Sequence, residues 1–209
     1  MIHGEQSEPG REEAAAPKAP AAGIRPSSPS EERGGRARRG AERALIDDYA
    51  RLLGYPAGKP LEGDVLARAE EALDWYRRHG KPRVVTRVVG SETLAAITAG
   101  FEVEDQVAKL WASERVDEAY FLDRLAAAVV EHLAASLGNG RSPGHRGFPI
   151  EEQSKLYALV EPEEIELLPS GMLRPVHSIL AVYDPSDESA QQSPCSLCDW
   201  RCSFRRKAA

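Results

Sequence analysis

The segment 138–147 has the residue types of a ligand-binding loop: four glycines, one proline, two arginines and a histidine within ten positions. Glycine lets backbone N–H and C=O groups approach a ligand closely, and a neighbouring arginine can form a bidentate contact with a carboxylate or phosphate. A mobile connection between two helices would have a similar composition. Because neither the Walker A spacing nor a dinucleotide fingerprint is present, composition leaves both interpretations open.

A second group with chemical potential is the cysteine cluster Cys195, Cys198 and Cys202 near the C-terminus. The spacing suits ligation of a soft metal by thiolates, and His177 or an exogenous ligand would fill the fourth position. Basic neighbours favour the thiolate form of these residues. A zinc or iron–sulfur site, redox-active or free thiols, and an inert tail all remain open, whereas a disulfide framework is not indicated.

Other titratable residues give weaker signals. Asp123 lies on the flank of the apolar stripe of the longest predicted helix, where a charged side chain usually faces solvent and can pair with Arg124. No Ser/His/Asp or Cys/His set can be assembled from the five scattered histidines. Hydrolase chemistry is therefore not indicated, and no catalytic side chain is assigned.

Charge and hydropathy exclude several classes of protein. The formal net charge is −6, and residues 41–209 carry this acidic excess because the first 40 residues are nearly balanced. An acidic body does not favour nucleic-acid binding, which requires a basic face. No stretch approaches the ~20 apolar residues that span a bilayer, and the N-terminus lacks the apolar core of a secretory signal. We expect a cytoplasmic protein that binds neither nucleic acid nor membrane.

Three regions follow from the patterns along the chain. Residues 1–41 are rich in glycine and proline and poor in large apolar residues, so we expect a disordered tail; 42–183 form the folded domain; and 184–209 are a polar tail with the cysteines. Helical spacing of apolar residues predicts helices at 42–53, 64–79, 103–112, 117–137 and 153–160. Apolar and β-branched residues predict strands at 83–89, 165–168 and 178–183. Helices mixed with separated strands indicate an α+β fold.

Several segments, taken in order, resemble the activation (reactivation) domain of vitamin B12-dependent methionine synthase, especially its short stand-alone form. They cover about two-thirds of the chain, and their order makes the resemblance more specific than any single motif. The segments are Leu52-Leu53-Gly54-Tyr55, then Asp123, then Arg141-Ser142-Pro143-Gly144-His145, then Phe148-Pro149 with Glu152-Gln153, and finally Ser170-Gly171-Met172 with Pro175 and Ser178.

The resemblance implies a single curved domain of long helices around a twisted antiparallel sheet, with a shallow site for S-adenosylmethionine. It implies that Arg141 holds the ligand's carboxylate, that the backbone of 142–144 takes its polar edges, and that His145 and Asp123 belong to the site. In this family, bound adenosylmethionine methylates cob(II)alamin while a flavodoxin-like reductant supplies an electron. The protein orients the ligand, and the cofactors carry the chemistry.

The chain departs from the family at two positions: His145 stands where the family has tyrosine, and Ala127 stands where full-length enzymes have glutamate. It also lacks the Asp-x-His-x-x-Gly sequence that ligates cobalt. A corrinoid-binding methyltransferase subunit is therefore the expected partner, and methionine biosynthesis the expected pathway. The alternative is an accessory protein that docks on a corrinoid protein or binds zinc or an iron–sulfur cluster, without adenosylmethionine chemistry.

Overall fold

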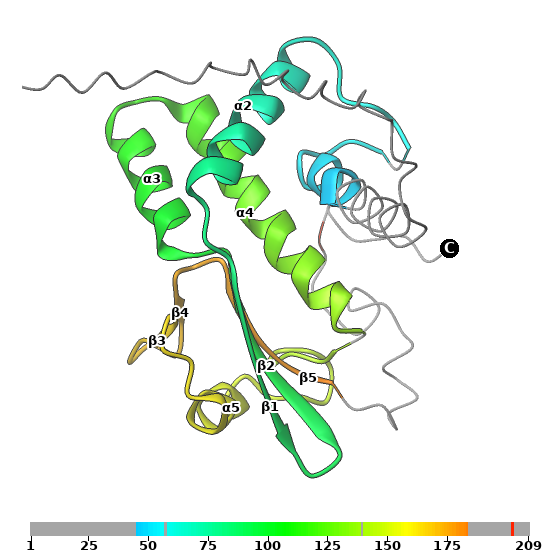
Figure 1. The fold of residues 1–209 in the computed structure, drawn as a ribbon, viewed down its shortest axis with the longest axis vertical. Helices are drawn as coiled ribbons and strands as arrows, with labels where there is room; N and C mark the ends of the chain where they lie inside the picture. Colours follow the sequence, from blue (N-terminus) through cyan, green and yellow to red (C-terminus); the bar gives the residue numbers. More distant parts are fainter. Residues whose placement is uncertain (1–44, 57, 139, 184–201, 203–209) are drawn as a thin grey trace, which may run out of the picture.

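A three-stranded antiparallel sheet with helices on both faces forms the body of the protein (Figure 1). Its strand order is β1-β2-β5, so β2 is central. One core cluster lies between the sheet and the helices α2, α3 and α4, and a second lies between the sheet and α5. The computed structural model describes residues 45–56, 58–138, 140–183 and 202.

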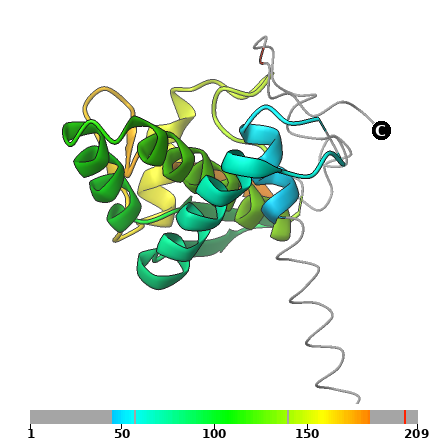
Figure 2. The same cartoon turned by 90° about the horizontal axis from the view of Figure 1, so that it is seen from above.

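The helical layer is built around α4, Val116–Ser136, which packs against α2, Gly63–His79, and α3, Phe101–Ala112. Three of its buried residues are alanines, which allow neighbouring helices to approach closely. The helical residues 45–52 lie against the same layer (Figure 2). There Tyr49 is fully buried, and its hydroxyl donates a hydrogen bond of 2.9 Å to the carbonyl of Phe121.

The sheet begins with a hairpin. β1, Arg83–Val89, pairs with β2, Glu92–Thr98, across a two-residue turn, and β2 also pairs with β5, Ser178–Tyr183. Side chains of β2 alternate between the two core clusters, so Ala95 and Ile97 face the helical layer whereas Leu94 and Ala96 face α5. The central strand is therefore buried on both faces.

A smaller unit covers the second face of the sheet. It consists of α5, Glu152–Val160, and a short antiparallel pair formed by β3, Glu166–Leu167, and β4, Leu173–Arg174. Leu156 and Val160 of α5 join the second core cluster. Beside them, the hydroxyl of Tyr157 donates to the carbonyl of Ile165 at 2.8 Å and ties the chain after α5 to the helix.

These elements confirm the predicted α+β class and antiparallel sheet. The predicted helices and strands are present within a few residues of their expected bounds, but β2 and β4 were not predicted. None of the helices that the structure describes is long and apolar enough to cross a membrane. The expected disordered tail and most of the cysteine tail lie outside the described residues.

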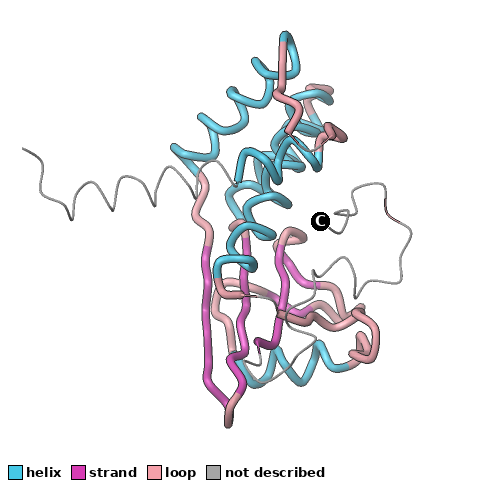
Figure 3. Tube along the Cα trace, turned by 90° about the vertical axis from the view of Figure 1, so that its right-hand side faces the viewer, coloured by secondary structure: helices cyan, strands magenta, loops and turns pink. Residues whose placement is uncertain are grey.

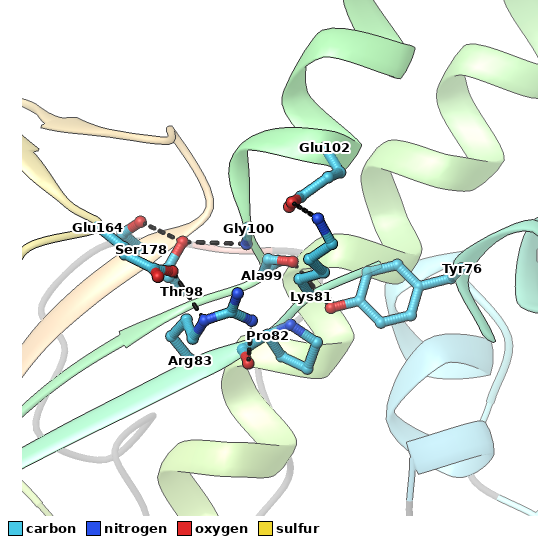
Figure 4. A network of polar contacts seen from close by, with 10 residues as sticks. All are labelled: Tyr76, Lys81, Pro82, Arg83, Thr98, Ala99, Gly100, Glu102, Glu164 and Ser178. Atoms are coloured by element: carbon cyan, nitrogen blue, oxygen red, sulfur yellow. Dashed lines mark hydrogen bonds and ion pairs between the residues drawn. The ribbon is translucent and has the colours of Figure 1, made fainter. Parts of the chain in front are cut away.

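A polar network holds the end of the sheet to the helical layer (Figure 4). The hydroxyl of Thr98, at the end of β2, accepts from the N–H of Gly100 at 3.1 Å and from the hydroxyl of Ser178 at 2.9 Å, and donates to the carbonyl of His177 at 3.3 Å. The hydroxyl of Tyr76 donates to the carbonyl of Ala99 at 2.9 Å. Helix α2 and the strands β2 and β5 therefore meet at the start of α3.

Gly100 cannot be replaced at this junction without strain. Its φ is +101°, and a Cβ atom would lie 2.7 Å from the carbonyl oxygen of Lys81. We expect Gly100→Ala to lower the free energy of unfolding in urea by about 2–4 kcal/mol. Gly63→Ala is the matched control, because its φ is +58° but nothing lies within 4 Å of the new Cβ, so we expect a loss of about 1–2 kcal/mol. Equal losses would contradict the contact with Lys81.

Candidate functional site

The predicted ligand loop connects α4 to α5 and is anchored on the outer edge of β5. Arg141 and Val182 form an isolated antiparallel bridge, with N–H···O distances of 2.9 and 2.8 Å. Gly140 lies under the ring of Tyr183, where a Cβ atom would approach ring carbons to 2.6 Å. The hydroxyl of Tyr183 donates in turn to the carbonyl of Ala134 at the end of α4. The loop is therefore fixed to the sheet at its start.

Hydrogen bonds within the loop use most of its backbone donors. The N–H of Ser142 donates to Nδ1 of His145 at 3.2 Å, and the N–H of His145 donates back to the carbonyl of Ser142 at 3.0 Å. The N–H of Gly144 donates to the carbonyl of Phe148 at 2.8 Å, and Pro143 has no N–H. In this conformation a ligand would meet side chains and carbonyl oxygens of the loop rather than a cradle of N–H groups.

The side chains of Arg141 and His145 give the loop its electrostatic character. The guanidinium of Arg141 lies 5.7 Å from the centroid of the Phe148 ring, a cation–π contact that steadies its long side chain. Burial, and then the charge of Arg141, lower the pKa of His145. Because Nδ1 of His145 accepts a hydrogen bond, the neutral ring carries its proton on Nε2. With His145 neutral, Arg141 and the exposed Arg146 are the cations that this loop can offer to an anionic ligand, and Arg141 is the half-buried one.

Asp123 lies at a different place. It is on α4, where one carboxylate oxygen accepts from Nε of Arg124 at 3.0 Å and the other lies 3.3 Å from Nε2 of His177. His177 directly precedes β5, whereas Arg141 pairs with the strand close to its end, about 16 Å away along the backbone. The structure brings Arg141, Ser142, Gly144 and His145 together and places Asp123 at the other end of β5.

Sequence reasoning did not find the polar cluster around His177. Glu104 of α3 accepts hydrogen bonds from Nε of Arg174 at 2.9 Å and from the N–H of Val176 at 2.6 Å. Burial lowers the pKa of His177, although the charge of Asp123 opposes this shift. Its Nδ1 is buried and has no hydrogen-bond partner among the described residues. No spacing in the sequence signals this cluster, because its members come from α3, α4, β4 and the approach to β5.

The metal prediction remains untested. Cys202 is exposed, and Cys195 and Cys198 lie outside the described residues. No group of three histidine, cysteine, aspartate or glutamate side chains among the residues that the structure describes is arranged to hold a metal ion. His177, considered as a fourth metal ligand, instead faces Asp123.

A cavity of about 370 Å³ lies between α2, α3 and α4, away from the predicted site residues. Trp75, Arg78 and Leu122 are among its lining residues, together with two arginine–glutamate pairs. In these pairs Arg68 contacts Glu71 and Arg115 contacts Glu118. The cavity is therefore of mixed charge and contains none of the residues singled out from the sequence.

The two half-buried histidines, His145 and His177, predict a loss of stability in mild acid. In the unfolded chain a histidine takes up a proton near its ordinary pKa of 6.5, whereas the folded state holds the pKa of His145 and His177 lower. The unfolded state therefore binds more protons below about pH 6.5, and the free energy of unfolding falls. We expect urea midpoints to fall between about pH 7 and about pH 5.5, and less steeply in His177→Asn. An unchanged slope in that variant would contradict the burial of this ring.

Comparison with known proteins gives a structural likeness and no likeness in sequence. No family model matches the chain, and no curated protein matches its sequence. Among solved structures, it is similar to the crystal structure of the MetH reactivation domain bound to AdoHcy, with a TM-score of 0.55 and 15% sequence identity. The likeness covers 70% of this chain and 76% of the other. At this identity the likeness shows a shared fold.

Proposed function

We propose that this protein binds S-adenosylmethionine and acts as the reactivation subunit of a cobalamin-dependent methionine synthase or a related corrinoid methyltransferase. The observation that carries the proposal is the fold shared with a MetH reactivation domain whose crystal structure contains AdoHcy. AdoHcy is what remains of adenosylmethionine after its methyl group has been transferred. The ordered sequence motifs around Arg141 support the same function.

The loop residues fit the anionic end of this ligand. A guanidinium is the side chain best suited to pair with a carboxylate, because it can form two parallel hydrogen bonds. Arg141 is half-buried, its backbone is bonded to β5, and its guanidinium lies near the Phe148 ring. These contacts limit its rotamers, so less entropy is lost when it binds a carboxylate.

The chain's part in the reaction is binding and orientation. When bound, adenosylmethionine supplies the methyl group, while cob(II)alamin on a corrinoid-binding partner accepts it together with one electron from a flavodoxin-like reductant. Transfer of a methyl group from a sulfonium needs no general acid or base at the protein. The residues assigned here are accordingly ligand holders, and their positioning is the source of the rate enhancement. We place this reaction in cytoplasmic methionine biosynthesis.

Calorimetric titration with S-adenosylmethionine tests the ligand site. We expect the full chain to bind and Arg141→Ala to bind about ten- to hundredfold more weakly, because a charge-assisted hydrogen bond contributes about 1.5–3 kcal/mol. Arg146→Ala is the matched control, since Arg146 is an exposed arginine of the same loop, and we expect its affinity to match the wild type. Failure of the wild type to bind at millimolar ligand would reject the proposal.

A second function is favoured by the closed geometry of the loop. Most of its N–H groups already donate hydrogen bonds within the loop or to β5, and Ala127 stands where full-length enzymes have glutamate. Both features favour an accessory protein that docks on a corrinoid protein, or holds a metal at its cysteines, without binding adenosylmethionine. Such a protein would bind a corrinoid partner but would show no heat of binding in a calorimetric titration with adenosylmethionine.

Metal analysis of anaerobically purified protein tests the cysteine cluster. If Cys195, Cys198 and Cys202 are ligands, we expect about one zinc ion per chain, or the visible absorption of an iron–sulfur cluster. Cys195→Ser should lose this metal, because a ligand is removed, and should retain binding of adenosylmethionine. A colourless wild-type protein without zinc would exclude a metal role for the cluster.

A further inference from the structure

The outer edge of the sheet at β1 is exposed and apolar. Val84, Val85, Val88 and Val89 are 39%, 38%, 72% and 40% exposed, and no strand pairs with this edge within the described part of the chain. Figure 3 shows the strands side by side, and in Figure 1 the β1–β2 hairpin projects beyond the other described elements. An open edge of this kind is a template for pairing with another strand.

Two of the devices that usually protect such an edge, proline and a bulge, are absent from β1. Its two charged residues point to the α5 face, where Arg83 pairs with Glu164 at 2.8 Å and Arg87 pairs with Glu161 at 3.2 Å. The opposite face of β1 presents only Val84, Thr86 and Val88. No charge on that face opposes the approach of a second strand.

The turn geometry identifies the backbone groups that face outward. Val89 and Glu92 flank a two-residue turn that starts at Gly90 with φ of +63°, so they form a hydrogen-bonded pair. Alternation then directs the N–H and C=O of residues 84, 86 and 88 away from β2. The same alternation continued across the sheet directs Val182 outward from β5, which is where it bonds to Arg141.

We propose that two copies of this chain associate through their β1 strands, antiparallel and centred on Thr86, to form one continuous sheet. In this register Thr86 lies opposite Thr86 of the second copy, and Val84 lies opposite Val88. Each of these residues has outward N–H and C=O groups, so each pair exchanges both hydrogen bonds of an antiparallel ladder. Thr–Thr and β-branched pairs are also favourable neighbours across strands.

The arginines select this register. Centring on Thr86 places Arg87 opposite Val85 of the second copy and Arg83 opposite Val89. A shift that centres the pairing on Val85 would place Arg83 opposite Arg87, and one that centres it on Arg87 would place two copies of Arg87 opposite each other. Like charges directly opposite one another are destabilising. The arrangement centred on Thr86 avoids both contacts and pairs all seven residues of β1, which centring on Val84 or Val88 would not do.

A second copy suits this edge better than the chain's own terminal segments. Residues 184–209 contain no valine, isoleucine, threonine or tyrosine, and residues 1–44 contain two separated isoleucines as their only β-branched residues. Both segments are therefore poor in β-branched residues, which favour strands. β1 itself supplies four valines and a threonine within seven residues.

Sedimentation velocity of the full chain over a range of concentrations tests the proposal. We expect a monomer–dimer equilibrium that Val88→Lys weakens at least about tenfold, because a lysine on an edge strand opposes pairing with a second strand. Val116→Lys is the matched control: Val116 is 50% exposed at the start of α4, and we expect no change. Thr86→Pro removes an outward donor without breaking the β1–β2 ladder, so it should give a monomer with an unchanged circular dichroism spectrum. A monomeric wild type, or a dimer unaffected by Val88→Lys, would overturn the proposal.

Cross-linking tests the register. In a background with Cys195, Cys198 and Cys202 changed to serine, oxidation should link two copies of Thr86→Cys, because the paired Cα atoms lie about 5.5 Å apart. Val88→Cys should not link to itself, since it lies opposite Val84 and about 13 Å along the strand from its own copy. Efficient linkage through Val88→Cys and none through Thr86→Cys would reject pairing centred on Thr86.

Discussion

The hydrogen bonds of the Thr98 hydroxyl position β5 and the start of α3 relative to β2. Thr98 is 1% exposed, and the one donor and two acceptor positions of its hydroxyl are all used, by the carbonyl of His177, the N–H of Gly100 and the hydroxyl of Ser178. Leaving a buried hydroxyl unpaired would cost about 1–3 kcal/mol. Thr98 therefore fixes both the start of α3 and the register in which β5 meets β2. The ligand loop is bonded to β5 through Arg141 and Val182, so its position also depends on the hydrogen bonds of Thr98.

Most of the fold could be predicted because most elements have one buried face. Apolar stripes reveal α2 and α4, and β-branched residues reveal β1, since these are local patterns. β2 was missed because its run Leu94-Ala95-Ala96-Ile97 is buried on both faces and therefore shows no alternation. Alanine is also a poor strand former when judged by propensity alone. Only the packing of helices on both sides of the sheet makes this segment a strand.

The candidate site was predictable in composition but not in arrangement. Glycine and arginine content located the loop, whereas its bridge to Val182 and its contact with Tyr183 join residues far apart in the sequence. The pair formed by Asp123 and His177 has the same origin, because no local pattern connects α4 with the approach to β5. The internal hydrogen bonds of the loop depend on side-chain geometry that spacing does not encode. Sequence reasoning therefore identified the loop residues that could bind a ligand, but not which of their N–H groups already donate hydrogen bonds within the protein.

The strand order places the two proposed interactions on opposite edges of one sheet. β5 carries the Arg141 bridge on its outer side, and β1 has its open edge on the other, with β2 between them. Association through β1 would bury none of the residues assigned to ligand binding. A symmetric dimer would also keep both loops at the far ends of the continuous sheet, where a corrinoid protein could approach each one. The two proposals are thus independent: loss of self-association would leave the ligand loop intact, and closure of the loop would leave the β1 edge unchanged.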